Sequence, residues 1–412
     1  MPCFAGSAVD RRGILDNGFM KTNRIREWFR SIRVPRGVII AVCVLPAVLT
    51  ALFYALRWLP SVMDWAATFV SAPIRGFLGM LSAFYPFSMT EVLITVVIIW
   101  LIYYVAKTIS VNSRRRGKWK ILGKRLLPVL VAALYFWSMF CWLWNSGYHA
   151  PGFASKNGFS GEGVSVADLT AVTRLFAEKA NELSLEVERD REGRYSENRR
   201  QMFDDSTEIF NGIASEFPSL ETRLFRPKPM AFSWLMSRTG YSGMYFALTG
   251  ETNINTRPPG AMMPMTVAHE HAHHLGIFAE DEANFVAILA CITSGNTAFE
   301  YAGYLSGLAH LLNALFPEDI QAWIEISDSF TDELIRDWQA NSDFWRSQRE
   351  VSIGVDFIDN ILTSVVVTVS DTVDTIYDEF LKSQSQELGI NSYGAFIDLL
   401  VEYCVTRGKI SG

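Results

Sequence analysis

Three apolar stretches in the first third of the chain constrain its fold more than any other feature. They cover residues 37–60, 91–109 and 126–144, and each contains at most two charged residues. About 20 apolar residues are enough for a helix to cross the hydrocarbon core of a bilayer. We therefore expect a membrane domain of three transmembrane helices over residues 37–145.

Basic clusters beside these stretches predict their orientation. Residues 1–36 and 107–125 are rich in Lys and Arg, and such segments stay on the cytoplasmic side of a membrane. Residues 61–89 mix aromatic side chains with charges and prolines, so we expect an interfacial helix and a turn at the membrane surface. An ordinary extramembrane loop is the alternative. Three crossings then place residues 146–412 outside the cytoplasm, whereas a further crossing within 61–89 would reverse that placement.

The distribution of charge argues against a nucleic-acid-binding protein. The net charge of −6 averages a first half with basic clusters and an acidic second half. Basic runs that flank apolar segments are typical of membrane proteins. The five cysteines contain no CxxC pair, which argues against a zinc site made of cysteines.

The chain after residue 163 has mostly helical periodicity. Apolar residues recur at helical spacing over 165–188, and Ser165 and Asp168 have the S-x-x-D form of a helix start. The segment 241–256 is rich in aromatic and β-branched residues, which predicts one or two short strands. Further helical segments are expected over 196–216, 285–315 with a break near 294–295, 317–346, 352–384 and 392–406. These patterns predict a mainly α domain with a small β element.

A cluster of histidines within this domain predicts a metal site. Residues 269–273 read His-Glu-His-Ala-His, an HExxH motif, and four of the six histidines of the chain lie within residues 269–274. On a helix, His269 and His273 project from one face and can bind one metal ion. Glu270 lies next to the first ligand and can take the proton of an activated water molecule. The motif therefore predicts zinc with Glu270 as the general base.

A catalytic zinc site needs a third protein ligand and one open position. Ala279 stands where metzincins have their third histidine, which leaves Glu280 and Glu282 as candidate ligands. Residues 280–284 resemble the E-x-E-A-D/N signature of gluzincin-type membrane metallopeptidases and of ImmA/IrrE-like peptidases. The resemblance implies that Glu280 is the third ligand and that Asn284 hydrogen-bonds a ligand histidine and fixes its tautomer. Glu282, rotated by about 200° on a helix, is the alternative ligand.

A wider resemblance covers most of residues 37–405. Four pieces carry it: residues 86–88 ahead of Glu91, 249–255, 269–284 and 389–394. They resemble domain-of-unknown-function family 3810, a family of bacterial polytopic membrane proteins. The resemblance implies membrane spans followed by an HExxH domain, and it names no substrate.

Other candidate site residues have simpler interpretations. His271 and His274 lie off the ligand face, so we expect both to be structural or solvent-facing. His310 is expected to pack between helices, with a role in stabilising the transition state as the alternative. Tyr393 lies in a turn, where tyrosines usually pack, although its hydroxyl could donate to an oxyanion. The strand segment 244–256 either binds an extended peptide by β-augmentation or covers the core as a hairpin.

Together these features predict a membrane-anchored, gluzincin-like zinc metallopeptidase in the bacterial cell membrane. Its three transmembrane helices precede a helical, zincin-like ectodomain with a small β element outside the cytoplasm. The expected partners are the lipid bilayer and a peptide or protein substrate, and no nucleic acid. The alternatives are a non-catalytic sensor or scaffold with a structural metal site, and a transporter-like or assembly protein without metal. The substrate and the oligomeric state stay open.

Overall fold

The computed structural model describes residues 35–113, 118–349, 375, 378 and 396–407. Several sequence features lie outside these residues. They are the basic segment up to residue 34, the centre of the basic loop at 114–117, most of the helix expected over 352–384, and the segment 389–394 with Tyr393.

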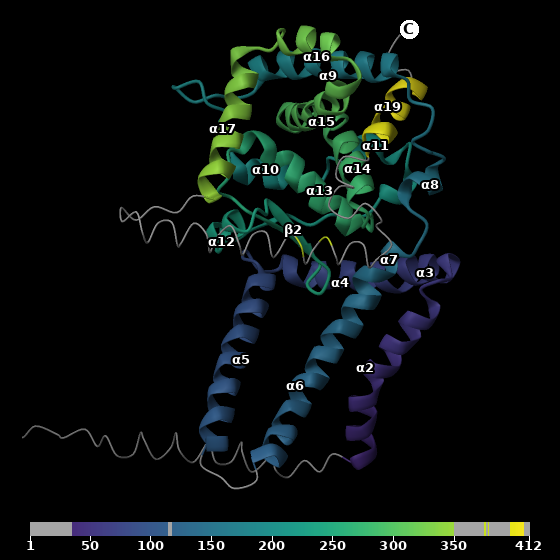
Figure 1. The fold of residues 1–412 in the computed structure, drawn as a ribbon, viewed down its shortest axis with the longest axis vertical. Coiled ribbons are helices and arrows are strands. Elements are labelled where there is room, and N and C mark those ends of the chain that lie inside the picture. Colours follow the sequence, from purple (N-terminus) through teal and green to yellow (C-terminus); the bar gives the residue numbers. More distant parts are fainter. Residues whose placement is uncertain (1–34, 114–117, 350–374, 376–377, 379–395, 408–412) are drawn as a thin grey trace, which may run out of the picture.

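Three long helices form one end of the molecule (Figure 1). They are α2 (Arg36–Leu56), α5 (Met89–Ser113) and α6 (Lys118–Phe140). α6 contacts both of the others, and the Tyr135 hydroxyl and the Trp142 indole donate hydrogen bonds to carbonyls of α2. Most apolar side chains of α2 and α5 are exposed, as expected for helices whose surroundings are lipid rather than water.

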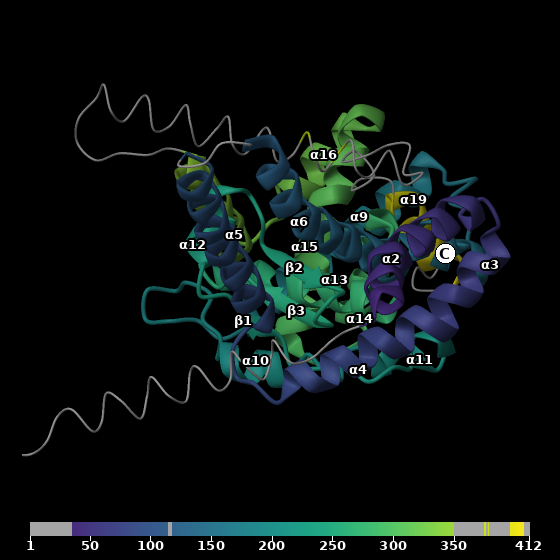
Figure 2. The ribbon, with the colours of Figure 1, turned by 90° about the horizontal axis from the view of Figure 1, so that it is seen from below.

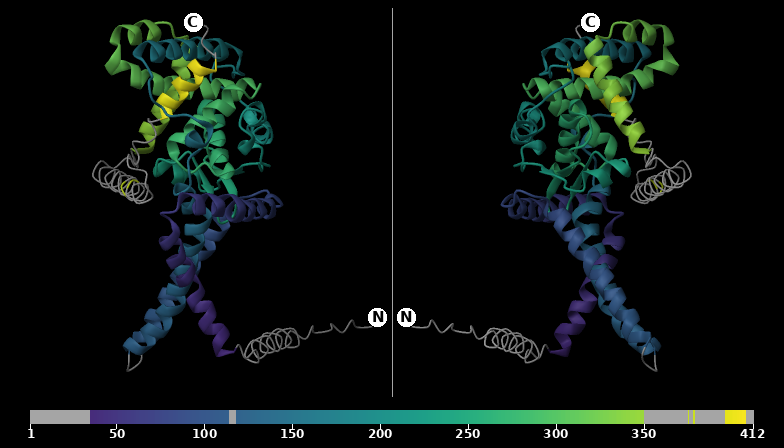
Figure 3. Two further views of the ribbon diagram at one scale, coloured as in Figure 1. Left: turned by 90° about the vertical axis from the view of Figure 1, so that its right-hand side faces the viewer. Right: turned by 90° about the vertical axis from the view of Figure 1, so that its left-hand side faces the viewer.

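A further apolar segment lies across these three helices. It consists of α3 (Pro60–Ala66), the π-helix η1 (Ala67–Ser71) and α4 (Ala72–Ala83). It separates the three helices from the rest of the molecule (Figures 1 and 3). The buried Arg75 of α4 donates to the Leu143 carbonyl at 3.1 Å and lies over the Phe278 ring. α4 is therefore packed against the helical domain.

Among the residues that the structure describes, three helices are long and apolar enough to cross a membrane: Pro60–Ala83, Met89–Ser110 and Arg125–Tyr148. The apolar helix Ile40–Leu56 is shorter. The predicted number of three is confirmed. By length and composition, however, the first of them is the segment we expected to be interfacial, and the helix that matches the first predicted span is shorter.

The helical domain is built around α9 (Val166–Glu186), α13 (Met263–Leu275), α14 (Glu280–Ile292) and α15 (Thr297–Glu318). α15 packs against the other three, and the apolar side chains between them are almost fully buried. The predicted cap of α9 is confirmed, because the Ser165 side chain and Asp168 bond each other's backbone amides. The predicted break before α15 is also confirmed, with Gly295 at φ +71° and Asn296 as the N-cap.

Shorter elements complete the described chain. The segment predicted as one helix over 196–216 is two short helices, because Ser206 ends the first and donates back to the Phe203 carbonyl. The elements are η2 (Cys141–Asn145), α7 (Ser146–Tyr148), α8 (Phe153–Asn157), α10 (Arg199–Asp205), α11 (Asn211–Ala214), η3 (Pro218–Leu220), α12 (Ser233–Arg238), η4 (Gly260–Met262), α16 (Ile320–Ser327), α17 (Asp332–Arg349) and α19 (Phe396–Thr406).

A small sheet lies between α13 and α4 (Figures 1 and 2). Its order is β1 (Lys228–Pro229), β3 (Glu251–Ile254) and β2 (Gly243–Phe246). β1 runs parallel and β2 antiparallel to β3. The expected mainly α fold with a small β element is thus confirmed, and β2 is an edge strand of the sheet next to α13.

Candidate metal centre

The HExxH motif lies on α13, and its two outer histidines share one face. Pro264 stands in the first turn of the helix, where its missing N–H costs no hydrogen bond. Gly276 ends the helix with φ +98°, a left-handed C-cap that glycine adopts without strain. The rings of His269 and His273 lie 4.7 Å apart. The turn after Gly276 brings the start of α14, and with it Glu280, back toward these rings.

Glu280 completes a compact group of three possible ligands. Its Oε2 atom lies 3.1 Å from Nε2 of His269 and 3.6 Å from Nε2 of His273. One ligand atom from each residue lies within 4.8 Å of the others. Zinc bonds of about 2.0–2.2 Å in a tetrahedral site place neighbouring donor atoms about 3.3–3.6 Å apart. The donor set and its spacing therefore fit zinc, and among the described residues this is the one such group.

Hydrogen bonds orient both histidine rings. Nδ1 of His269 lies 2.9 Å from Oδ1 of Asn284, and Nδ1 of His273 lies 2.7 Å from the carbonyl oxygen of Ile277. Because these oxygens accept, each Nδ1 carries the proton. In a neutral ring the Nε2 atom is then unprotonated, and it faces Oε2 of Glu280, as two ligands of one metal ion would. Asn284 thus contacts His269, the arrangement that the resemblance implied.

The charges of the two central glutamates differ because their surroundings differ. Burial raises the pKa of Glu270 to about 7; His269 opposes this shift and Glu280 adds to it. For Glu280, burial alone would also raise the pKa, but His273 and His269 hold it well below its ordinary value. Glu280 is therefore ionised near neutral pH, while the higher pKa of Glu270 is of the kind that suits a general base.

The edge strand β2 passes very close to Glu270, at a glycine. A Cβ atom at Gly243 would lie 2.7 Å from Oε1 of Glu270 and 2.9 Å from the Thr266 side chain. Only glycine allows this approach without a shift of the backbone or of Glu270. Gly243 lies within the predicted strand segment, and glycine within a strand is a signal for close contact with another element.

The alternative ligand, Glu282, lies outside the group. Its two oxygens accept hydrogen bonds from the backbone amides of Phe153 and Ala154, at 2.7 and 2.9 Å. Glu282 therefore caps the start of α8. The two glutamates project from different faces of α14, and the structure brings Glu280 rather than Glu282 to the histidines.

The other histidines of the motif are packing residues. His271 is buried, with its ring nitrogens 3.3 Å from the Thr252 hydroxyl and 3.2 Å from the Ser206 hydroxyl. His274 lies edge-on to the Phe225 and Tyr245 rings. Burial lowers the pKa of His271 to about 3 and that of His274 to about 4, so both are neutral. The expected structural roles are confirmed.

His310 also lies apart from the candidate centre. Its ring packs edge-on against Phe396, at 5.0 Å between ring centroids. Burial lowers its pKa below the ordinary value. His310 does not line the cavity beside the three candidate ligands. Its position agrees with the expected packing role and not with a role in stabilising a transition state.

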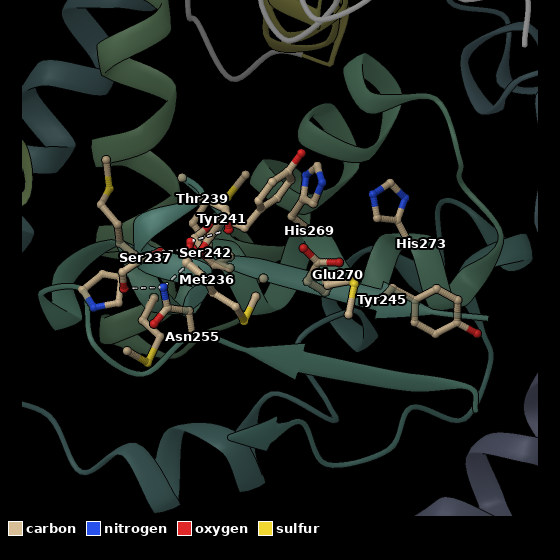
Figure 4. Close-up of a pocket in the computed structure, with 18 of the residues that line it drawn as sticks. Met236, Ser237, Thr239, Tyr241, Ser242, Tyr245, Asn255, His269, Glu270 and His273 are labelled. Atoms are coloured by element: carbon tan, nitrogen blue, oxygen red, sulfur yellow. Dashed lines mark hydrogen bonds between the residues drawn. The ribbon is translucent and has the colours of Figure 1, made fainter. Parts of the chain in front are cut away.

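A cavity of about 1150 Å³ opens beside the three candidate ligands. Its walls come from β2, α12, α13, α17 and the region where α6 ends. Figure 4 shows Glu270 between the strand and the two histidines, and Tyr241 on the same side as His269. This cavity and Tyr241 were not predicted, because the elements that enclose it are far apart in the sequence.

Two buried glutamates join the start of α5 to the sheet and to α12. Glu251 of β3 accepts hydrogen bonds from the backbone amides of Met89 and Thr90, at 3.0 and 2.8 Å, and from the Thr90 hydroxyl at 2.8 Å. Reciprocally, Glu91 of α5 accepts from the backbone amides of residues 231 and 232, at 2.8 and 2.7 Å. Charged acceptors at a helix N-terminus are among the stronger hydrogen bonds in proteins. The first turn of α5 is thus fixed to the strand next to β2.

Comparison with known proteins gives a family but no function. No curated protein matches the chain, and no solved structure matches it. The family model described as "Protein of unknown function (DUF3810)" matches residues 67–401, which include α5, α6 and the candidate metal centre. Because this match covers most of the chain, the protein belongs to the DUF3810 family.

Proposed function

We propose that the protein is a membrane-anchored zinc metallopeptidase. The observation that carries the proposal is the convergence of His269, His273 and Glu280 beside a cavity that also contains Glu270. These three residues would hold the zinc ion. When bound, zinc supplies a Lewis acid that lowers the pKa of water and polarises the scissile carbonyl.

The protein's own residues supply the remaining steps of hydrolysis. The carboxylate of Glu270 takes a proton from the attacking water and passes it to the leaving amine. Glu270 lines the cavity beside the candidate ligands, where its carboxylate can exchange a proton with water and with the amine. Tyr241 lines the cavity on the side of His269, and its hydroxyl is our candidate donor to the oxyanion.

We propose that an extended peptide pairs with β2. The Ser242 carbonyl accepts from the Asn255 amide, and the register of β2 with β3 then turns the backbone of Gly243 and Tyr245 away from β3. β2 lines the cavity beside Glu270. An extended substrate added along this edge would present its backbone to the candidate metal centre.

We also propose that α2, α5 and α6 cross the bilayer and that α3 and α4 lie on its surface. The crosswise position of α3 and α4 and the exposed rings of Trp65 and Phe69 support this arrangement. With the basic segments on the cytoplasmic side, we infer that the candidate metal centre lies outside the cytoplasm of a bacterial cell. A structural zinc site would have four protein ligands, whereas the group among the described residues has three and faces a cavity.

Metal analysis of the purified full chain tests the zinc site. We expect about one zinc ion per chain in the wild type and almost none in the double variant His269→Ala/His273→Ala. His310→Ala is the matched control, because this histidine lies against Phe396 and outside the group. A wild type without zinc, or a double variant that keeps it, would overturn the proposal.

Asn284→Ala is expected to weaken zinc binding by about 10–100-fold. The substitution removes the acceptor that orients the His269 ring and fixes its proton on Nδ1. Asn284→Asp keeps an acceptor at this position and should bind zinc much more tightly than the alanine variant. Competition with a chromophoric chelator measures both affinities, and equal values for wild type and Asn284→Ala would contradict the role of Asn284.

A further inference from the structure

The cavity beside the candidate metal centre also reaches the end of a membrane helix. Phe140 and Trp144 line the cavity, and both belong to the apolar helix Arg125–Tyr148, which is long enough to cross a membrane. The Trp144 ring lies 5.3 Å from the ring of His273. The candidate metal centre is therefore in direct contact with the segment that continues into the bilayer.

The short helix α12 gives the cavity a second apolar border. Leu235 lines the cavity and is 49% exposed. Its neighbours Phe232 and Trp234 are 45% and 52% exposed. α12 lies near the start of α5, just above the level of α4 in Figure 1, and beside α5 in Figure 2. Exposed aromatic and aliphatic side chains at this level are suited to the interface between lipid and water.

The walls between these borders are rich in methionine. Flexible, apolar methionine side chains adapt to apolar ligands of different shapes. Large exposed apolar surfaces usually mark a site for a membrane or a ligand. Apolar side chains therefore line much of the cavity between polar residues such as Ser237 and Asn341. The methionines that line it are Met236, Met244, Met262, Met263 and Met265.

We propose that the substrate is a membrane-anchored polypeptide, cleaved in the segment next to its anchor. This inference rests on the proposed peptidase function. The anchor stays in the bilayer beside α6, and the adjoining segment enters past Phe140 and Leu235 to reach Glu270. Hydrolysis breaks one peptide C–N bond, with the hydroxyl of water going to the carbonyl carbon and a proton to the amine. A transmembrane helix and an acyl chain are both apolar anchors that fit this route.

The test uses the full chain in lipid nanodiscs, loaded with zinc, and one pool of peptides with a randomised segment. The pool is prepared without an anchor, with a transmembrane helix and with a palmitoyl chain. We expect the anchored forms to be cleaved at least about tenfold faster, because the membrane raises their local concentration and the cavity receives them. The two anchored forms distinguish the kinds of anchor. Faster cleavage of the unanchored pool would overturn the inference while supporting the peptidase function.

A pair of variants separates the cavity from the effect of the membrane alone. Leu235→Asp places a charge at the border of the cavity and should lower the ratio of anchored to unanchored cleavage several-fold. Leu185→Asp is the control, because Leu185 is an exposed leucine near the end of α9 (Val166–Glu186), far from the membrane helices (Figure 1). An equal ratio in both variants and the wild type would contradict entry past α12.

Photo-crosslinking gives a readout that does not depend on hydrolysis. A benzophenone amino acid at position 140 should capture the anchored peptides and leave the unanchored pool uncaptured. If capture is selective but no peptide is cleaved, the peptidase proposal fails and the membrane-side entry stands. If all forms are captured equally, the inference on the substrate fails whatever the enzyme cleaves.

Discussion

Glu270→Gln is expected to bind zinc like the wild type and to hydrolyse peptides about 10²–10⁴-fold more slowly. Glutamine has the shape of glutamate and fits the narrow space between α13 and Gly243. Its amide cannot take a proton from water, so the chemical step loses its base. The three candidate ligands keep their positions. Zinc content and the rate of zinc-dependent cleavage, measured on the same preparation, test both halves of the prediction.

The matched control for this variant is Glu178→Gln, an exposed glutamate of α9 (Val166–Glu186). It removes the same charge from a place remote from the cavity and should leave zinc content and rate unchanged. Full activity of Glu270→Gln would contradict the proposed base. Loss of zinc together with activity would show instead that Glu270 holds the metal site together.

The candidate ligands could be predicted because their arrangement is largely local. His269 and His273 meet through the helical repeat of four residues, which needs no information from the rest of the chain. Gly276 predicts the end of α13, and the short turn after it limits where Glu280 can lie. The choice between Glu280 and Glu282 needed the structure. Glu282 is held at the start of α8 by amides 128 and 129 residues away in the sequence.

The placement of the apolar segments shows what composition alone leaves undetermined. Residues 60–83 are apolar enough to be counted as a span, yet the segment lies across the other helices (Figure 3). The contacts responsible are distant in sequence: the Ser71 hydroxyl bonds the Trp142 carbonyl and Arg75 bonds the Leu143 carbonyl. No periodicity of one segment encodes a contact of this kind. The ring contact between Trp144 and His273 escaped prediction for the same reason.

Two of the pieces that carried the family resemblance turn out to be joined to each other. Residues 86–88 precede α5 and residues 249–255 contain β3. The Ser88 hydroxyl bonds the Asn253 side chain at 2.7 Å, and Glu251 receives the amides of Met89 and Thr90. In the sequence these pieces are separate motifs without a stated role. In the structure these pieces connect the start of α5 to β3 through hydrogen bonds.

Glu251→Ala is therefore expected to destabilise the protein by about 3 kcal/mol. The glutamate side chain is buried, and its removal leaves the amides of Met89 and Thr90 without their acceptor and takes one partner from the Thr90 hydroxyl. A buried donor without a partner destabilises the folded state, because the same donor is hydrogen-bonded to water in the unfolded chain. Thr90→Val removes one of the three bonds to Glu251, together with the contacts of the Thr90 hydroxyl to the Thr249 hydroxyl and the Asn253 amide, and should cost about 1–2 kcal/mol. Thermal unfolding of the full chain in nanodiscs compares the variants.

The double variant Glu251→Ala/Thr90→Val tests whether these two residues stabilise the protein through their mutual contact. If the Thr90 hydroxyl acts mainly through Glu251, the double variant should lose clearly less free energy of unfolding than the two single variants lose together. Glu221→Ala removes an exposed glutamate from a turn of the same domain and serves as the control. Additive losses of stability would contradict a direct coupling between Glu251 and Thr90. A Glu251→Ala protein as stable as this control would contradict the stabilising role of Glu251. Glu251 lies outside the cavity. Loss of its bonds would let β3 shift and would displace the paired strand β2 from Glu270. We therefore expect Glu251→Ala to slow hydrolysis in the chains that remain folded.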